Sequence, residues 1–114
     1  MKEIYKQIDY MKNDLIDLSL QIHSNPEIKW EEFEAIKNIE TLLNKYDIKI
    51  NKIKDLPTAF TASIKGDSKG PVIALLAEYD ALPGIGHACG HNLIAMTNIG
   101  AFLGFLALKG NFPG

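Results

Sequence analysis

Apolar residues recur at helical spacing through the first half of the chain. Between residues 4 and 22 they are four or three positions apart, with charged residues between them: Ile4, Ile8, Met11, Leu15, Leu18 and Ile22. This spacing predicts an amphipathic helix that ends before Asn25 and Pro26. A second apolar stripe consists of Phe33, Ile36, Ile39, Leu43 and Tyr46. Because proline suits the first turn of a helix, we expect this second helix to open at Pro26 and Glu27.

The middle of the chain shows the shorter patterns of strands. Residues 48–53, rich in isoleucine and lysine, predict a short strand, and apolar residues that alternate with polar ones at 60–64 predict a half-exposed strand. Residues 72–77 are a continuous apolar run after a turn segment at 66–70. Such a run is typical of a strand that is buried on both faces of a sheet. The order of elements predicts a layered α/β fold, with a mixed sheet and helices on both faces.

Residues 93–108 are almost wholly apolar. The run is shorter than the roughly 20 residues of a bilayer span, and it includes Thr97 and Asn98. We therefore expect a buried helix and no membrane association. Gly100 and Gly104 lie one helical turn apart, which predicts close packing against the sheet or another backbone.

Composition narrows the class of protein further. A chain of 114 residues makes one domain or less, and its net charge of −2 includes no basic stripe of the kind that binds nucleic acid. The single cysteine cannot form an internal disulfide, which favours a reducing compartment. The first residues lack the apolar core of a signal peptide. We therefore expect a cytoplasmic protein that binds no nucleic acid.

Candidate chemistry is concentrated directly after the apolar run at 72–77. Glu78 and Asp80 are two positions apart, so in an extended segment both carboxylates point to the same side. Sites of open α/β sheets lie at the carboxyl ends of strands. Two like charges at a buried edge are costly unless a cation or hydrogen-bond donors compensate them. The alternative is that one carboxylate caps the loop while the other is solvated.

Cys89 and His91 precede the apolar helix and are also two positions apart. Thiolate and neutral imidazole are both good zinc ligands. Beside the two carboxylates and His87, this pair predicts part of a metal site. A cysteine nucleophile with His87 or His91 as its base stays open as an alternative, although the sequence identifies no donor for an oxyanion.

Residues 77–92 (AEYDALPGIGHACGHN) closely resemble a signature of the aminoacylase and carboxypeptidase-like metallohydrolases. More narrowly, they resemble the branch with aminobenzoyl-glutamate hydrolase, the indole-acetyl-amino-acid hydrolases and related dipeptidases. Residues 23–27 (HSNPE) add a second match, since that branch has a His-x-x-Pro-Glu turn after its first helix. The two matched segments bracket most of the chain, and the predicted order of elements agrees with this family.

The resemblance implies a zinc-peptidase-like catalytic domain with a two-metal site at the edge of its sheet. By position, Cys89 and His91 correspond to metal ligands, and Asp80 corresponds to the acid that supports catalysis by orienting a ligand or bridging group. Glu78 lies where relatives with a two-zinc signature have a histidine, which makes it a third candidate ligand. His87 and His23 are expected to have structural roles. The expected metal is zinc, with manganese as the alternative if carboxylates join the ligand set.

The resemblance also implies that residues 1–114 are the N-terminal part of a catalytic domain. The inserted dimerisation domain and the C-terminal half, with the glutamate that acts as general base, would then be absent. The first hypothesis is a metal-dependent amidohydrolase that cleaves N-acyl amino acids or dipeptides, represented here by its N-terminal part. The second is a non-catalytic remnant that folds and self-associates. In either case an apolar sheet edge favours a homo-oligomer.

Overall fold

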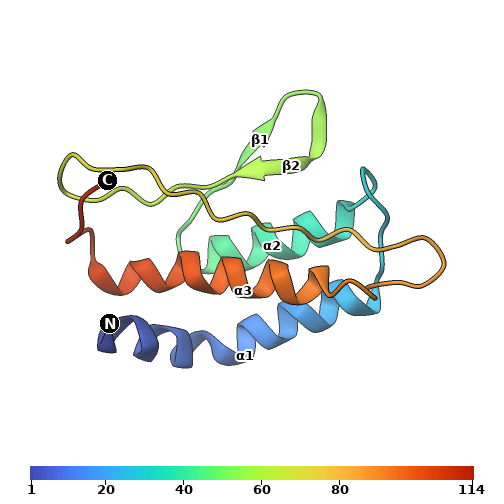
Figure 1. The fold of residues 1–114 in the computed structure, drawn as a ribbon, viewed down its shortest axis with the longest axis horizontal. Helices are drawn as coiled ribbons and strands as arrows, with labels where there is room; N and C mark the ends of the chain where they lie inside the picture. The colour runs from blue at the N-terminus through green and yellow to red at the C-terminus, as the bar shows by residue number, and fades with distance from the viewer.

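The computed structural model describes residues 1–114, which fold into three long helices and a small hairpin (Figure 1). The elements in chain order are α1 (Lys2–Ser24), α2 (Phe33–Lys45), β1 (Asn51–Ile53), β2 (Leu56–Thr61), α3 (His91–Gly104) and the 3-10 helix η1 (Phe105–Leu108). Helix α1 packs against both α2 and α3, and it runs in the opposite direction to α3 (Figure 1). The core therefore lies between helices, with α1 at its centre.

One apolar cluster connects the three helices. Its buried members are Met11, Leu15, Leu18, Ile22, Ala35, Ile39, Leu42, Leu43, Ala95, Ile99 and Leu103. The members from α1 belong to the predicted stripe, and α1 ends at Ser24, before the predicted stop. The Asn25 N–H still donates to the Ile22 carbonyl, and Pro26 follows. The prediction for the first helix is confirmed because helical periodicity and the proline stop agree.

Helix α3 confirms the expected helix in the last apolar run. A Cβ atom added at Gly100 would lie 3.0 Å from Leu15 Cδ1, and one added at Gly104 would lie 3.1 Å from Ile4 Cγ2. The two glycines thus allow α3 to approach α1 closely, and the neighbour is a helix, not a sheet. By length and composition alone, the stretch His91–Leu108 could also cross a membrane; a third of it is buried within this chain.

The second helix begins at Phe33, so the predicted start at Pro26 is wrong. Residues between the two helices form a turn in which Trp30 adopts a left-handed backbone with φ 73°. Glu27 lies in this turn, and its carboxylate accepts hydrogen bonds from the backbone N–H groups of Glu34 and Ala35, both at 2.9 Å. Glu27 therefore caps α2 through space instead of occupying its first turn.

Strands β1 and β2 form an antiparallel hairpin, with Asn51 opposite Thr61 and a bulge between Lys52 and Ile53. The predicted strand at 48–53 is thus present in its last three residues. The predicted strand at 60–64 begins earlier, at Leu56, and ends at Thr61. Helix α2 packs against β2.

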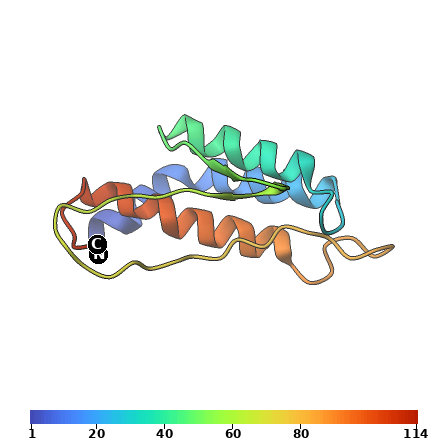
Figure 2. The same cartoon turned by 90° about the horizontal axis from the view of Figure 1, so that it is seen from above.

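The predicted buried strand at 72–77 is not formed. Residues between β2 and α3 run as an extended chain along the helices (Figures 1 and 2), and this run has no strand beside it. Val72 is 96% exposed, and Ile73 and Leu76 are each 76% exposed. A strand needs neighbours to pair its backbone N–H and C=O groups, and no segment of this chain supplies them. The expected mixed sheet between two helical layers is consequently a two-stranded antiparallel sheet here.

Candidate metal site

Tight turns shape the loop between residue 80 and α3. Leu82 and Gly86 exchange backbone hydrogen bonds, at 2.9 Å and 3.2 Å. Gly84, Gly86 and Gly90 have φ values of 76°, 63° and 74°, a backbone region that side chains with a Cβ rarely adopt. Gly90 is also the residue before α3, so His91 is the first residue of that helix. The glycine spacing therefore places His91 at a defined point where the loop ends.

The two segments that resemble the hydrolase family lie side by side. The Ala81 N–H donates to the Glu27 carbonyl at 2.7 Å, within a short parallel bridge between Ile28 and Ala81. The rings of His23 and His87 are 6.3 Å apart between centroids. The turn after α1 thus supports the loop that contains the candidate ligands, a contact between residues far apart in sequence.

His91 is the centre of the polar cluster. Its Nδ1 atom forms a hydrogen bond of 2.7 Å with Asp80 Oδ1, and its Nε2 atom lies 3.5 Å from Glu78 Oε2. Both carboxylates therefore face the same ring, as their spacing predicted. Because an ionised carboxylate can only accept, Nδ1–H is the donor to Asp80, which leaves the Nε2 lone pair of the neutral ring on the side of Glu78. A carboxylate behind one nitrogen is the usual support of a histidine that binds metal through the other.

Cys89 is exposed and forms no hydrogen bond with either neighbouring histidine. No group of three or more His, Cys, Asp or Glu side chains is arranged to hold a metal ion. The residues present thus fit part of a metal site, an imidazole with its orienting carboxylate, and do not complete one. The ligand roles of Cys89, His91 and Glu78 stay predictions, and the thiol nucleophile gains no support from this geometry.

His87 lies against the loop without a polar partner. Both of its ring nitrogens are buried and form no hydrogen bond. Burial lowers the pKa of His87 below its usual value, and the nearby His23 and His91 add to this effect, while the Ile22 carbonyl opposes it. His87 is therefore neutral at pH 7. Sequence reasoning gave it a structural role but could not foresee two unpaired nitrogens.

Two further residues position the site and were missed or only noted from the sequence. Glu27 joins the turn to Ala81 through its backbone while its side chain caps α2. Asn92, directly after His91, is buried, and its side-chain amide donates to Ser19 Oγ at 3.0 Å. This bond fixes the first turn of α3 on α1. The sequence signal was present in both cases, since both residues lie within the segments that resemble the family.

The chain is similar over most of its length to several characterised hydrolases, although no family model matches it. It is 33% identical to thermostable carboxypeptidase 2 of Saccharolobus solfataricus over 84% of the chain. It is 34% identical to a p-aminobenzoyl-glutamate hydrolase of Escherichia coli over 96% of the chain. It is 38% identical to Xaa-Arg dipeptidase of Homo sapiens over 85% of the chain.

These matches place the chain in the M20 family of peptidases and amidohydrolases, as a homologue of part of its members. The family is metal-dependent, and this confirms the resemblance that residues 77–92 and 23–27 indicated. The chain spans 30%, 26% and 25% of the length of the three relatives, respectively. The homology implies an incomplete α/β domain, which accounts for the unpaired segment at 72–77.

Proposed function

We propose that these 114 residues contribute to a metal-dependent amidohydrolase that releases an amino acid from an N-acyl amino acid or a dipeptide. The observation that supports this proposal is the His91 ring, which has Asp80 on one nitrogen and Glu78 near the other. Nothing in the helical core requires this cluster, because His91 lies at the end of α3 and Glu78 is exposed. The cluster is therefore better explained by chemistry than by packing.

In this proposal Asp80 holds the His91 ring so that Nε2 presents its lone pair to the metal. Cys89 supplies a second ligand when the glycine-rich loop brings its thiol toward Nε2, and Glu78 supplies a third. Zinc fits an imidazole and a thiolate, and manganese fits better as carboxylates join. A bound ion of this kind supplies Lewis acidity to the scissile carbonyl and activates water. Further ligands and the general base come from outside these residues.

The substrate class is proposed from the relatives. Their names describe a carboxypeptidase, a hydrolase of p-aminobenzoyl-glutamate and a dipeptidase. Each of these names implies cleavage of an amide bond next to an amino acid. We extend this common chemistry to the complete protein, which we expect to be cytoplasmic and a homo-oligomer.

A chimera tests the proposal directly. Residues 1–114 would replace the homologous part of thermostable carboxypeptidase 2, and hydrolysis of N-acyl amino acids and dipeptides would be followed with zinc, with manganese and with a chelator. We expect metal-dependent hydrolysis by the chimera, a loss of at least about a hundredfold with His91→Ala, and no hydrolysis by residues 1–114 alone. Full activity of the His91→Ala chimera would contradict the proposal, as would turnover by the isolated chain.

The alternative function is that of a non-catalytic chain that folds and self-associates. Two observations favour it: no complete set of metal ligands is formed, and the apolar segment at 72–76 is exposed. The chimera separates the two functions. A folded chimera that is inactive with every metal would favour the non-catalytic chain.

A further inference from the structure

Tyr79 lies between the two carboxylates of the candidate metal site and points to the opposite side of the chain. Glu78 and Asp80 face His91, whereas the Tyr79 ring packs against the core and stacks on Phe60 of β2. The ring centroids of Tyr79 and Phe60 are 6.3 Å apart, with 25° between the planes. The Tyr79 hydroxyl donates to the carbonyl oxygen of Thr58, also on β2. One side chain thus joins the carboxylate segment to the hairpin at two points.

The backbone of residues 78–80 has no other anchor. It forms no backbone hydrogen bond, and the first bond beyond it is that from the Ala81 N–H to the Glu27 carbonyl. A segment without a strand neighbour would be free to rotate about its axis, which would turn the carboxylates away from His91. The contacts of Tyr79 prevent this rotation, because an aromatic ring packed in the core fixes which side of the segment faces inward.

The surroundings of Tyr79 keep its hydroxyl protonated and able to donate. Burial, together with the charge of Glu32, raises the pKa of Tyr79 to about 12. Glu32 is itself buried; its Oε1 atom accepts a hydrogen bond from the Trp30 N–H at 2.9 Å, and its Oε2 atom has no partner. The hydroxyl is therefore a donor to Thr58 throughout the range in which a hydrolase works.

We propose that Tyr79 is a positioning residue of the candidate metal site, which holds residues 78–80 on β2 so that Glu78 and Asp80 face the His91 ring. This role rests on the proposed function for its purpose, since a metal ligand benefits from a fixed ring. The arrangement that it explains is present in the chain without metal. The proposal can therefore be tested whether or not the chain binds an ion.

The test compares two tyrosines that each lose a hydrogen-bonding hydroxyl. Tyr79→Phe keeps the ring stack and removes the bond to Thr58. Tyr46→Phe is the matched control, because the Tyr46 hydroxyl donates to Asp14 Oδ2 at 2.5 Å, between α1 and α2. The readout is the set of ¹⁵N and ¹H resonances of the His91 imidazole in the metal-free chain, with Asp80→Asn as the reference for a disturbed Nδ1 bond. Zinc affinity by calorimetry is the second readout.

We expect Tyr79→Phe to shift the His91 resonances toward those of Asp80→Asn and to weaken zinc binding by about threefold to tenfold, below or at the usual loss for a direct partner of a ligand. Tyr46→Phe should leave both readouts unchanged. Phe60→Leu, which removes the stacked ring and keeps the hydroxyl, should shift the resonances in the same direction. If Tyr79→Phe and Phe60→Leu leave the His91 resonances unchanged, the positioning role is wrong. If the resonances shift while the chain binds no zinc, the positioning role stands and the metal site fails.

Discussion

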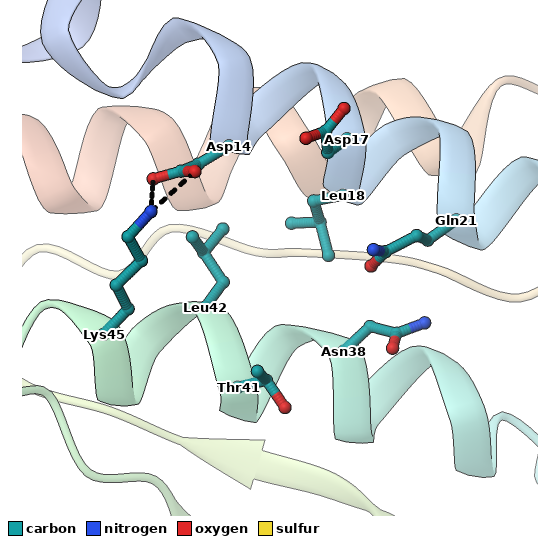
Figure 3. A pocket seen from close by; sticks show the side chains of 8 residues that line it. All are labelled: Asp14, Asp17, Leu18, Gln21, Asn38, Thr41, Leu42 and Lys45. Carbon is teal, nitrogen blue, oxygen red and sulfur yellow. Dashed lines mark hydrogen bonds and ion pairs between the residues drawn. The ribbon is translucent and has the colours of Figure 1, made fainter.

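At the scale of single residues, an ion-pair cluster joins α1 to α2 on the side of the core away from the candidate metal site. Lys45 Nζ lies 2.8 Å and 2.7 Å from the two Asp14 oxygens, and the Tyr46 hydroxyl donates to the same carboxylate. Figure 3 shows Asp14 and Lys45 facing each other across a groove between the two helices. The bond from Lys45, followed by that from Tyr46, holds the pKa of Asp14 below its usual value.

Replacing Asp14 predicts a change in the acid stability of the chain. A carboxylate with a lowered pKa stabilises the fold above its unfolded pKa of about 3.9, and this stabilisation is lost as the pH falls through its lower folded value. We expect Asp14→Asn to reduce the free energy of unfolding by about 1 kcal/mol at pH 7 and to have little effect in strong acid. Urea unfolding across this range measures the difference.

The matched control is Asp9→Asn, because Asp9 is an exposed carboxylate on the same helix without an ion pair. It should change the free energy of unfolding by less than about 0.5 kcal/mol. A destabilisation by Asp14→Asn that stays constant with pH would mean that the Asp14 charge has no part in stability.

At the scale of elements, Glu27 connects the start of α2 to the loop of the candidate site. Its carboxylate accepts from the N–H groups of Glu34 and Ala35, while its carbonyl accepts from Ala81. A negative charge at a helix N-terminus is favourable because the first N–H groups have no partner within the helix. The cap and the loop contact use different atoms of one residue, so a side-chain substitution separates them.

Removing the cap predicts a loss of stability that starts at α2. Glu27→Ala should lower the free energy of unfolding by about 1–2 kcal/mol, the usual cost of losing a capping side chain. Hydrogen exchange should accelerate most at the amides of Glu34 and Ala35, and chemical denaturation gives the total cost. Glu31→Ala is the control, since Glu31 is exposed and its side chain forms no hydrogen bond. Equal stability of the two variants would exclude the capping role.

Local patterns predicted those elements whose stability depends on their own sequence. The periodic stripe and the Asn25–Pro26 stop predicted α1, and the two-residue spacing predicted that Glu78 and Asp80 face the same way. The start of α2 was missed because Glu27 caps it across a turn. The contact of Tyr79 with Thr58, 21 positions apart, was missed because only the folded hairpin brings them together. The strand at 72–77 was predicted from apolarity, but strands also need partners.

At the scale of the whole molecule, the exposed segment at 72–76 is the main departure from a closed domain. Its backbone forms no hydrogen bond within the chain, and its side chains include Val72, Ile73, Leu75 and Leu76, all exposed. Apolar extended segments with unpaired backbone groups are templates for pairing with another strand. The relatives are three to four times longer than the part that this chain matches, so this segment is where more of the domain would pack.

Without such a covering, the isolated chain should self-associate through this segment. We expect dimers or larger species at high concentration by analytical ultracentrifugation, and a shift to monomers when Ile73 and Leu76 are both replaced by lysine. The control is Leu20→Lys, because Leu20 is an apolar residue of α1 that is 60% exposed. A monomeric parent chain at high concentration would exclude self-association, and equal association of all variants would exclude this segment as its site.

The central claim is that residues 1–114 contain part of a metal site centred on His91. Zinc titration by calorimetry tests it most directly, with the parent chain compared with Cys89→Ser and His91→Ala. We expect weak binding by the parent, because fewer than the four ligands of a closed zinc site are present, and loss of binding in both variants. No zinc binding by the parent chain, or binding that survives His91→Ala, would contradict the claim.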